Sequence, residues 1–111
     1  MRLDRDLPFN GEVVWLTPEQ GGRPSGPPLT PEDQDYAATA YIPPATVHSG
    51  VASFVIRAAD RTACRSAATA AWLIVENEGA YWVDNGTVLV VTEGARDEAY
   101  FHVRQVMSGS G

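Results

Sequence analysis

The chain has 111 residues, 44% of them hydrophobic, which excludes a disordered chain and is enough to bury a core without disulfide bonds or metals. Its formal net charge is −6, and its eight basic residues, all arginines, are scattered among fourteen acids. Nucleic-acid binders usually cluster positive charge, so this balance argues against a nucleic-acid partner.

No apolar run approaches the length of a membrane span, and the residues from Met1 to Asp6 lack the apolar stretch of a signal peptide. We therefore expect a cytoplasmic protein with no membrane contact. Cys64 is the only cysteine, which excludes an intramolecular disulfide and a cysteine-based metal site. We expect it to behave as a small, half-buried apolar residue.

Short runs rich in β-branched, aromatic and small residues recur along the chain, separated by turn residues. The predicted strands are Glu12–Leu16, Tyr36–Ile42, Val51–Ala58, Ala70–Glu76, Tyr81–Val83, Thr87–Thr92 and Glu98–Val106. All eight prolines precede residue 45, which leaves the second half free to form continuous ladders. This spacing predicts an all-β single domain, an antiparallel sandwich or barrel, over residues 1–107, with a flexible tail at 108–111.

Two turns and one alanine-rich stretch connect these strands. Asp84-Asn85-Gly86 is typical of a hairpin turn, and Glu93 to Asp97 is predicted to link the last two long strands. The stretch from Ala58 to Ala70 leaves three structures open, namely strand, turn or short helix.

Alternation assigns a core face to two strands. Ala52, Phe54 and Ile56 share one face, and Ala99, Phe101 and Val103 share another, so these six are the predicted core. Two strands are apolar on both sides. Trp72 and Ile74 oppose Leu73 and Val75, and Leu89 and Val91 oppose Val88 and Val90. Either another segment covers their outer faces, or those faces meet a partner.

The loop Gly21-Gly22-Arg23 raises the question of an anion site, because consecutive backbone N–H groups in a turn can cradle a phosphate. A phosphate loop normally leads into a helix, whereas this one leads into prolines. We expect both glycines to adopt φ values closed to other residues, and Arg23 to bond a carboxylate or loop carbonyls.

The first strand and its loop, read together with the late turns, resemble the carboxy-terminal β-barrel domain (domain 3) of elongation factor Tu. That domain begins with an apolar strand running into Gly-Gly-Arg and then proline, here residues 12–24. It also ends with an acidic turn, an apolar strand and a Glu-Gly-Gly-Arg turn, here Asp84-Asn85-Gly86, residues 87–92 and Glu93-Gly94-Ala95-Arg96. The resemblance implies a closed six-stranded antiparallel barrel of Greek-key character. This chain has no GTP-binding loop, so the resemblance implies no nucleotide chemistry.

Catalytic chemistry has little support in the sequence. Cys64, His48 and His102 are far apart, and two histidines with scattered acids are too few for a metal site. We predict no catalytic residue, no cofactor and no metal, with a small enzyme using Cys64 or His102 as the weakest alternative.

The leading functional hypothesis is a non-catalytic interaction module that binds a protein partner or a second copy of itself. The candidate interaction residues are Arg23, Trp72, Ile74, Val88, Val90 and Arg96. Three tryptophans exceed what a small barrel core usually takes, so at least one is expected at an interface. The alternative is a translation-related tRNA- or RNA-binding domain, which requires arginines 23, 57, 61, 65 and 96 to converge on one face.

Overall fold

Six antiparallel strands closing into a barrel form the computed structural model, which describes residues 3, 7–22, 26–28, 30–31, 33–45, 51–74, 83–94 and 96–107. The strands are β1 (Phe9–Trp15), β2 (Tyr36–Tyr41), β3 (Ala52–Ala58), β4 (Arg65–Trp72), β5 (Val88–Glu93) and β6 (Arg96–Val106). A 3₁₀ turn, η1 (Pro18–Gln20), follows β1. The predicted all-β closed barrel is confirmed for these residues.

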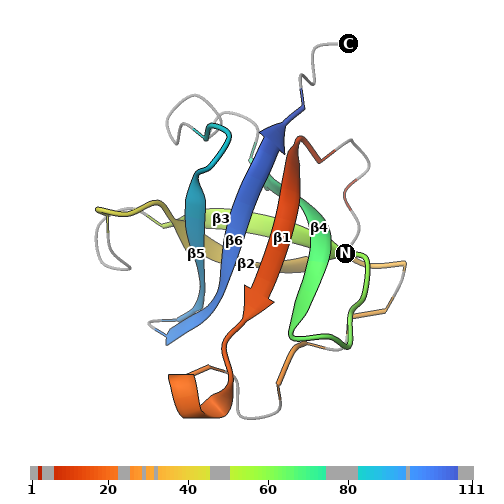
Figure 1. Ribbon diagram of the computed structural model, residues 1–111, viewed down its shortest axis with the longest axis vertical. Coiled ribbons are helices and arrows are strands. Elements are labelled where there is room, and N and C mark those ends of the chain that lie inside the picture. The colour runs from red at the N-terminus through yellow and green to blue at the C-terminus, as the bar shows by residue number, and fades with distance from the viewer. Residues whose placement is uncertain are drawn as a thin grey trace.

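The order of strands around the barrel is β1-β4-β3-β2-β5-β6, and β1 pairs with both β4 and β6 to close it. Strands β2, β3 and β4 follow one another as neighbours, and β1 lies beside β4, which is a Greek-key arrangement. In Figure 1, β5, β6, β1 and β4 lie side by side in front, and β2 and β3 cross behind them.

Closure depends on a very close approach of β1 to β6 at Gly11. A Cβ on Gly11 would lie 1.9 Å from the carbonyl oxygen of His102, far inside van der Waals contact. The register between the two strands shifts at Asn10 and Gly11, where β6 has one extra residue. Only glycine fits this point of the barrel.

The core inside the barrel follows the predicted alternation. Phe54, Ile56, Ala99, Phe101 and Val103 all belong to the buried cluster, and Ala52 packs against it, so that prediction is confirmed. Aromatic rings meet edge to face at its centre, where the Phe54 ring lies 5.1 Å from that of Trp72 and 5.8 Å from that of Phe101.

The boundaries of β1 and β4 differ from the prediction. β1 begins at Phe9 rather than Glu12, and β4 begins at Arg65 rather than Ala70. The alanine-rich stretch is therefore turn over 59–64 and strand from 65, with Ala68 and Ala70 in the core cluster. Its residues are small on both faces, which hides the period-two pattern that strand prediction relies on.

The two predicted turns have different outcomes. The turn from Glu93 to Arg96 does join β5 to β6, with Gly94 at a positive φ of 63°. The turn at Asn85 and Gly86 is also present, with φ of 90° at Gly86, but it leads into β5, whose neighbours are β2 and β6. The predicted strand 81–83 is not seen at Val83, which is buried outside any strand, and residues 81 and 82 lie outside the described part.

The opening loop is built on η1. The carbonyl side chain of Gln20 accepts a hydrogen bond from the Thr17 backbone N–H at 2.9 Å. Gly21 has a positive φ of 88°, as expected. Gly22 does not have a positive φ; glycine is needed there because a Cβ would lie 2.3 Å from the Leu16 carbonyl oxygen. Arg23, the tail 108–111 and His48 lie outside the described residues. In the part of the chain described, no helix has the length and apolarity needed to cross a membrane.

Candidate interaction face

One outer side of the barrel is covered by the chain itself. Val55 and Ala71 are cross-strand partners, both fully buried, and neither belongs to the core cluster inside the barrel. The start of the chain is held on this outer side, because the guanidinium of Arg57, two residues beyond Val55, donates to the Leu3 carbonyl oxygen at 3.2 Å. Leu7, buried and also outside the core cluster, follows in the same segment.

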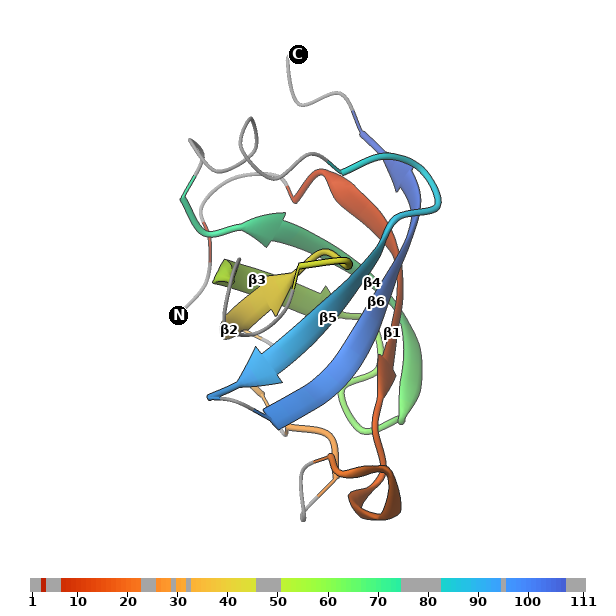
Figure 2. The same ribbon diagram turned by 90° about the vertical axis from the view of Figure 1, so that its left-hand side faces the viewer.

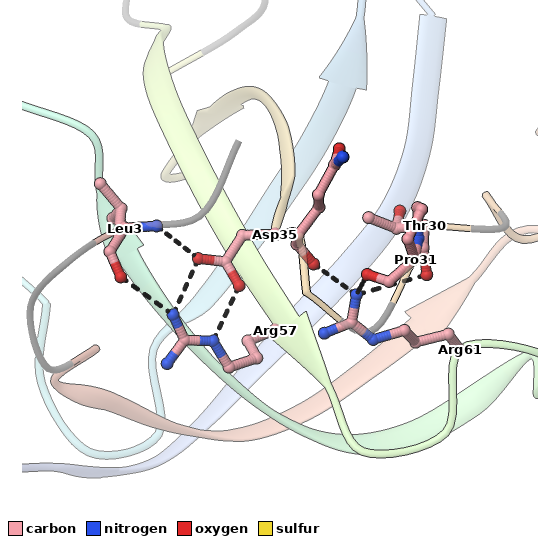
Figure 3. A network of polar contacts seen from close by, with 7 residues as sticks. Leu3, Thr30, Pro31, Asp35, Arg57 and Arg61 are labelled. Carbon is pink, nitrogen blue, oxygen red and sulfur yellow. Dashed lines mark hydrogen bonds and ion pairs between the residues drawn. The ribbon is translucent and has the colours of Figure 1, made fainter.

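Asp35 is the centre of this attachment (Figure 3). Its side chain is fully buried and accepts hydrogen bonds from Arg57 Nε at 2.7 Å, from Arg57 Nη2 at 2.9 Å and from the Leu3 backbone N–H at 2.9 Å. The carboxylate and the guanidinium form a bidentate pair, the strongest geometry for two such groups. We call Leu3, Asp35 and Arg57 the N-terminal clamp.

A neighbouring arginine holds the loop before β2 in place. One terminal nitrogen of Arg61 donates to the carbonyl oxygens of Thr30, Pro31 and Gln34 (Figure 3). Beside it, Trp15, Tyr36 and Arg61 help to line a cavity of about 10 Å³, about the least that one water molecule occupies. This hollow is too small for an organic ligand.

The barrel end next to this hollow carries a chain of polar side chains. The Tyr36 hydroxyl donates to Glu93, Glu93 lies 3.9 Å from the Arg96 guanidinium, and Arg96 Nε donates to Glu98. Glu98 is fully buried, and its second carboxylate oxygen has no hydrogen-bond partner among the residues that the structure describes. Arg96, a predicted interaction residue, is therefore tied to two carboxylates of its own chain.

The opposite outer side, formed by β5, β6 and β1, faces the viewer in Figure 1, and in Figure 2 its strand β5 lies beside β2, with which it pairs. Its outward apolar and aromatic residues come from these three strands and from the end of the neighbouring strand β2. We call them the tyrosine face: Val14, Tyr41, Val88, Val90 and Tyr100.

The centre of the tyrosine face is a valine between two tyrosines. Val90 is the cross-strand partner of Tyr41 on one side and of Tyr100 on the other, and only 5% of it is exposed. Tyr100 itself is 37% exposed, although it is a large, partly apolar side chain. Single apolar groups on a surface need no explanation, but adjacent ones on neighbouring strands form a contact surface.

Tyr41 is the chemically distinct member of the face. Its hydroxyl donates to Asp97 Oδ1 at 3.4 Å. Burial, followed by the charge and hydrogen bond of Asp97 and the proximity of Tyr100, raises the pKa of the Tyr41 phenol above its ordinary value. The phenol therefore stays neutral and keeps donating in any physiological buffer.

The predicted interaction residues do not form one surface. The expectation that Trp72 lies on an outer face is wrong, because it is fully buried in the core cluster. Ile74 is 52% exposed, but it lies past the end of β4. Val88 and Val90 do lie on the outer face of β5 and come together with Tyr41 and Tyr100. Of the tryptophans, Trp15 and Trp72 are buried, and residue 82 lies outside the described part.

The alternatives are placed as follows. Among the described arginines, Arg57 and Arg61 bond Asp35 and loop carbonyls, and Arg65 and Arg104 lie 3.1 and 3.5 Å from the carboxylate of Glu12. They do not converge on one basic face, which weakens the RNA hypothesis.

Cys64 is exposed in the turn before β4, not half-buried as expected, and His102 is exposed on β6. Within the described ranges, no group of three or more potential metal ligands comes together.

Sequence reasoning missed Val14, Tyr41 and Tyr100 as members of a site. Alternation in the last strand placed Tyr100 outward, but its neighbours come from residues 14, 41 and 90 through the strand register. Comparisons of the chain with protein-family models, with curated proteins and with solved structures found no match.

Proposed function

We propose that the protein is a non-catalytic interaction module that binds another protein chain through the tyrosine face. The observation that carries the proposal is the cluster of Tyr41, Val90 and Tyr100 on the outside of the barrel, from three neighbouring strands. Tyrosines are enriched at protein interfaces, since each presents a rigid ring and a polar tip at low cost in side-chain entropy.

The contrast between the two outer sides supports this choice. The apolar pair Val55 and Ala71 on β3 and β4 is fully buried beneath other parts of the same chain. Tyr100 on β6 keeps more than a third of its surface in contact with solvent. At the tyrosine face Val90 is also buried, but Tyr100 stays exposed beside it, so this side presents an aromatic ring for binding whereas the first side does not.

A protein partner fits this face better than RNA does. The charged groups around the face are of both signs. Asp97 bonds Tyr41, and Glu12 pairs with Arg65 and Arg104, so the face lacks the excess positive charge that phosphates require. We further propose that the barrel belongs with domain 3 of elongation factor Tu. Support comes from the two sequence corners, at η1 and between β5 and β6, and from the closed six-stranded order.

The proposal is tested by comparing three immobilised forms of the chain: wild type, Tyr100→Asp and Ile74→Asp. Each is exposed to an extract of the native cells, and retained chains, including the protein's own, are identified by mass spectrometry. Ile74→Asp is the matched control, because it places the same charge on an exposed apolar residue outside the tyrosine face.

We expect wild type and Ile74→Asp to retain at least one chain in similar amounts. The retained amount of that chain should be at least tenfold lower on Tyr100→Asp. A buried carboxylate without a partner is costly at an interface. Equal retention by all three forms, or none by wild type, contradicts the proposal.

A further inference from the structure

The strand register sets five outward residues of the barrel in one row. Tyr41 pairs with Val90, Val90 with Tyr100, Tyr100 with Val14, and Val14 with Arg65. Tyr100 is at the middle of the row, with one valine on each side and a long side chain at each end. The row therefore reads nearly the same from either end, apart from the charge at its ends.

The two end side chains lean back toward the middle, although the row runs around a closed barrel. The Tyr41 hydroxyl bonds Asp97 on β6, the strand of Tyr100. Arg65 Nε lies 3.1 Å from Glu12 on β1, the strand of Val14. Both ends are thus brought over β5, β6 and β1, the part of the barrel that faces the viewer in Figure 1.

The ends of the row have opposite charge. At the Tyr41 end lies the carboxylate of Asp97. At the other end, Arg65 and Arg104 share the single carboxylate of Glu12, so one positive charge is in excess there. The two arginine side chains are largely exposed, Arg65 at 69% and Arg104 at 70%, and are available to a partner.

We infer, on the basis of the proposed function, that the partner of the tyrosine face is a second copy of this chain, related by a two-fold axis that passes beside Tyr100. Such an axis exchanges the two ends of the row, so Asp97 of each copy faces Arg65 of the other. The two exposed Tyr100 rings then meet at the axis. Arg65 also reaches the Tyr41 ring of the other copy, a favourable cation–π arrangement.

The size of the face makes this association weak. Three strands about 4.8 Å apart, with their side chains, present a patch of roughly 15 by 20 Å, or about 300 Å² per copy. Stable interfaces bury about 800 Å² per partner, so we expect half-association only at about 0.1–1 mM protein. Because charged ends contribute, the association should weaken as salt is raised.

The test uses charge reversal at the two ends, with mass measured by sedimentation equilibrium at low salt. Asp97→Arg alone sets Arg against Arg65 at both ends of the dimer, and Arg65→Glu alone sets Glu against Asp97. Each variant should weaken self-association at least tenfold. An equimolar mixture should restore it, because the mixed dimer has one native contact and one reversed contact.

Folding of each variant is checked first by tryptophan fluorescence and thermal unfolding. Should Asp97→Arg fail to fold, Asp97→Asn replaces it, and the weakening it causes should shrink at high salt, where the wild type loses the same attraction. Asp84→Arg is the matched control, because it reverses an exposed acid in the turn before β5 and should leave association unchanged.

Three outcomes overturn the inference: a wild type that stays monomeric up to millimolar concentration, variants that associate like wild type, and variants whose mixture is not restored. None of these decides the proposed function, which survives if the wild-type bait retains a chain other than its own and the Tyr100→Asp bait does not. Conversely, if the wild-type bait retains only its own chain and the mixture restores association, the face serves self-association without a second cellular partner.

Discussion

Removal of the Asp35 carboxylate is the most direct test of how the start of the chain is held. Asp35→Ala deletes the hydrogen bonds from Arg57 and from the Leu3 N–H, so the guanidinium of Arg57 loses its bidentate carboxylate. Breaking a buried ion pair in this way usually costs about 3–5 kcal/mol. The Arg57 side chain is 25% exposed and so recovers part of its hydration, which brings the expected cost to about 2–3 kcal/mol.

For a domain of this length, that cost corresponds to a fall in Tm of about 8–12 °C. The assay is thermal and urea unfolding followed by tryptophan fluorescence, since Trp15 and Trp72 are buried. Arg65→Ala is the control. It removes one member of a pair whose guanidinium is 69% exposed, and we expect a cost below about 0.5 kcal/mol.

A double variant separates lost attraction from an uncompensated charge. Asp35→Leu with Arg57→Met removes both charges of the pair, so it should be less destabilised than Asp35→Ala alone. A cost below about 1 kcal/mol for Asp35→Ala, equal to that of Arg65→Ala, would refute the view that the N-terminal clamp stabilises the fold.

Two further predictions concern closure of the barrel and its tyrosine face. Gly11→Ala should lower the free energy of urea unfolding by about 3 kcal/mol or more, because the added methyl meets the rigid His102 carbonyl. Gly86→Ala, strained only by its positive φ, should lower it by about 1–2 kcal/mol. The reverse order of these two costs would contradict the account of closure. Because the pKa of Tyr41 is raised in the folded state, its neutral phenol contributes fully to stability at a pH below the ordinary pKa of 10.0. That contribution is lost as the pH rises through the higher pKa of the folded state. Unfolding free energy measured from pH 8 to 11 should therefore fall less steeply in Tyr41→Phe than in wild type, and identical slopes would exclude the assigned environment.

The fold was predictable from the sequence where side chains alternate in size and polarity. Phe54 and Ile56 in β3 and Phe101 and Val103 in β6 were assigned correctly to the core on this basis. In β4 the alternation is between alanine, serine and threonine, whose burial differs less in free energy, so its start was placed five residues late.

The interaction face was less predictable, because it depends on which strands are neighbours. Tyr41 and Tyr100 are separated by 59 residues in the sequence and come together only through Val90 in the register of β5. The start of the chain is likewise held by a residue far along the sequence, since Arg57 bonds Leu3, more than fifty residues earlier. Trp72 was misplaced because a strand that is apolar on both sides gives no local sign of which face points inward.

The circular pairing of the strands also limits how other molecules can recognise this protein. Since β1 bonds both β4 and β6, the six described strands offer no open sheet edge to which an extended peptide or another sheet could add. Recognition must then be by side chains, and substitutions at a few outward positions are enough to change the choice of partner without altering the backbone. The same closure protects the chain from edge-to-edge aggregation, so a concentrated solution of the folded protein should remain free of fibrils.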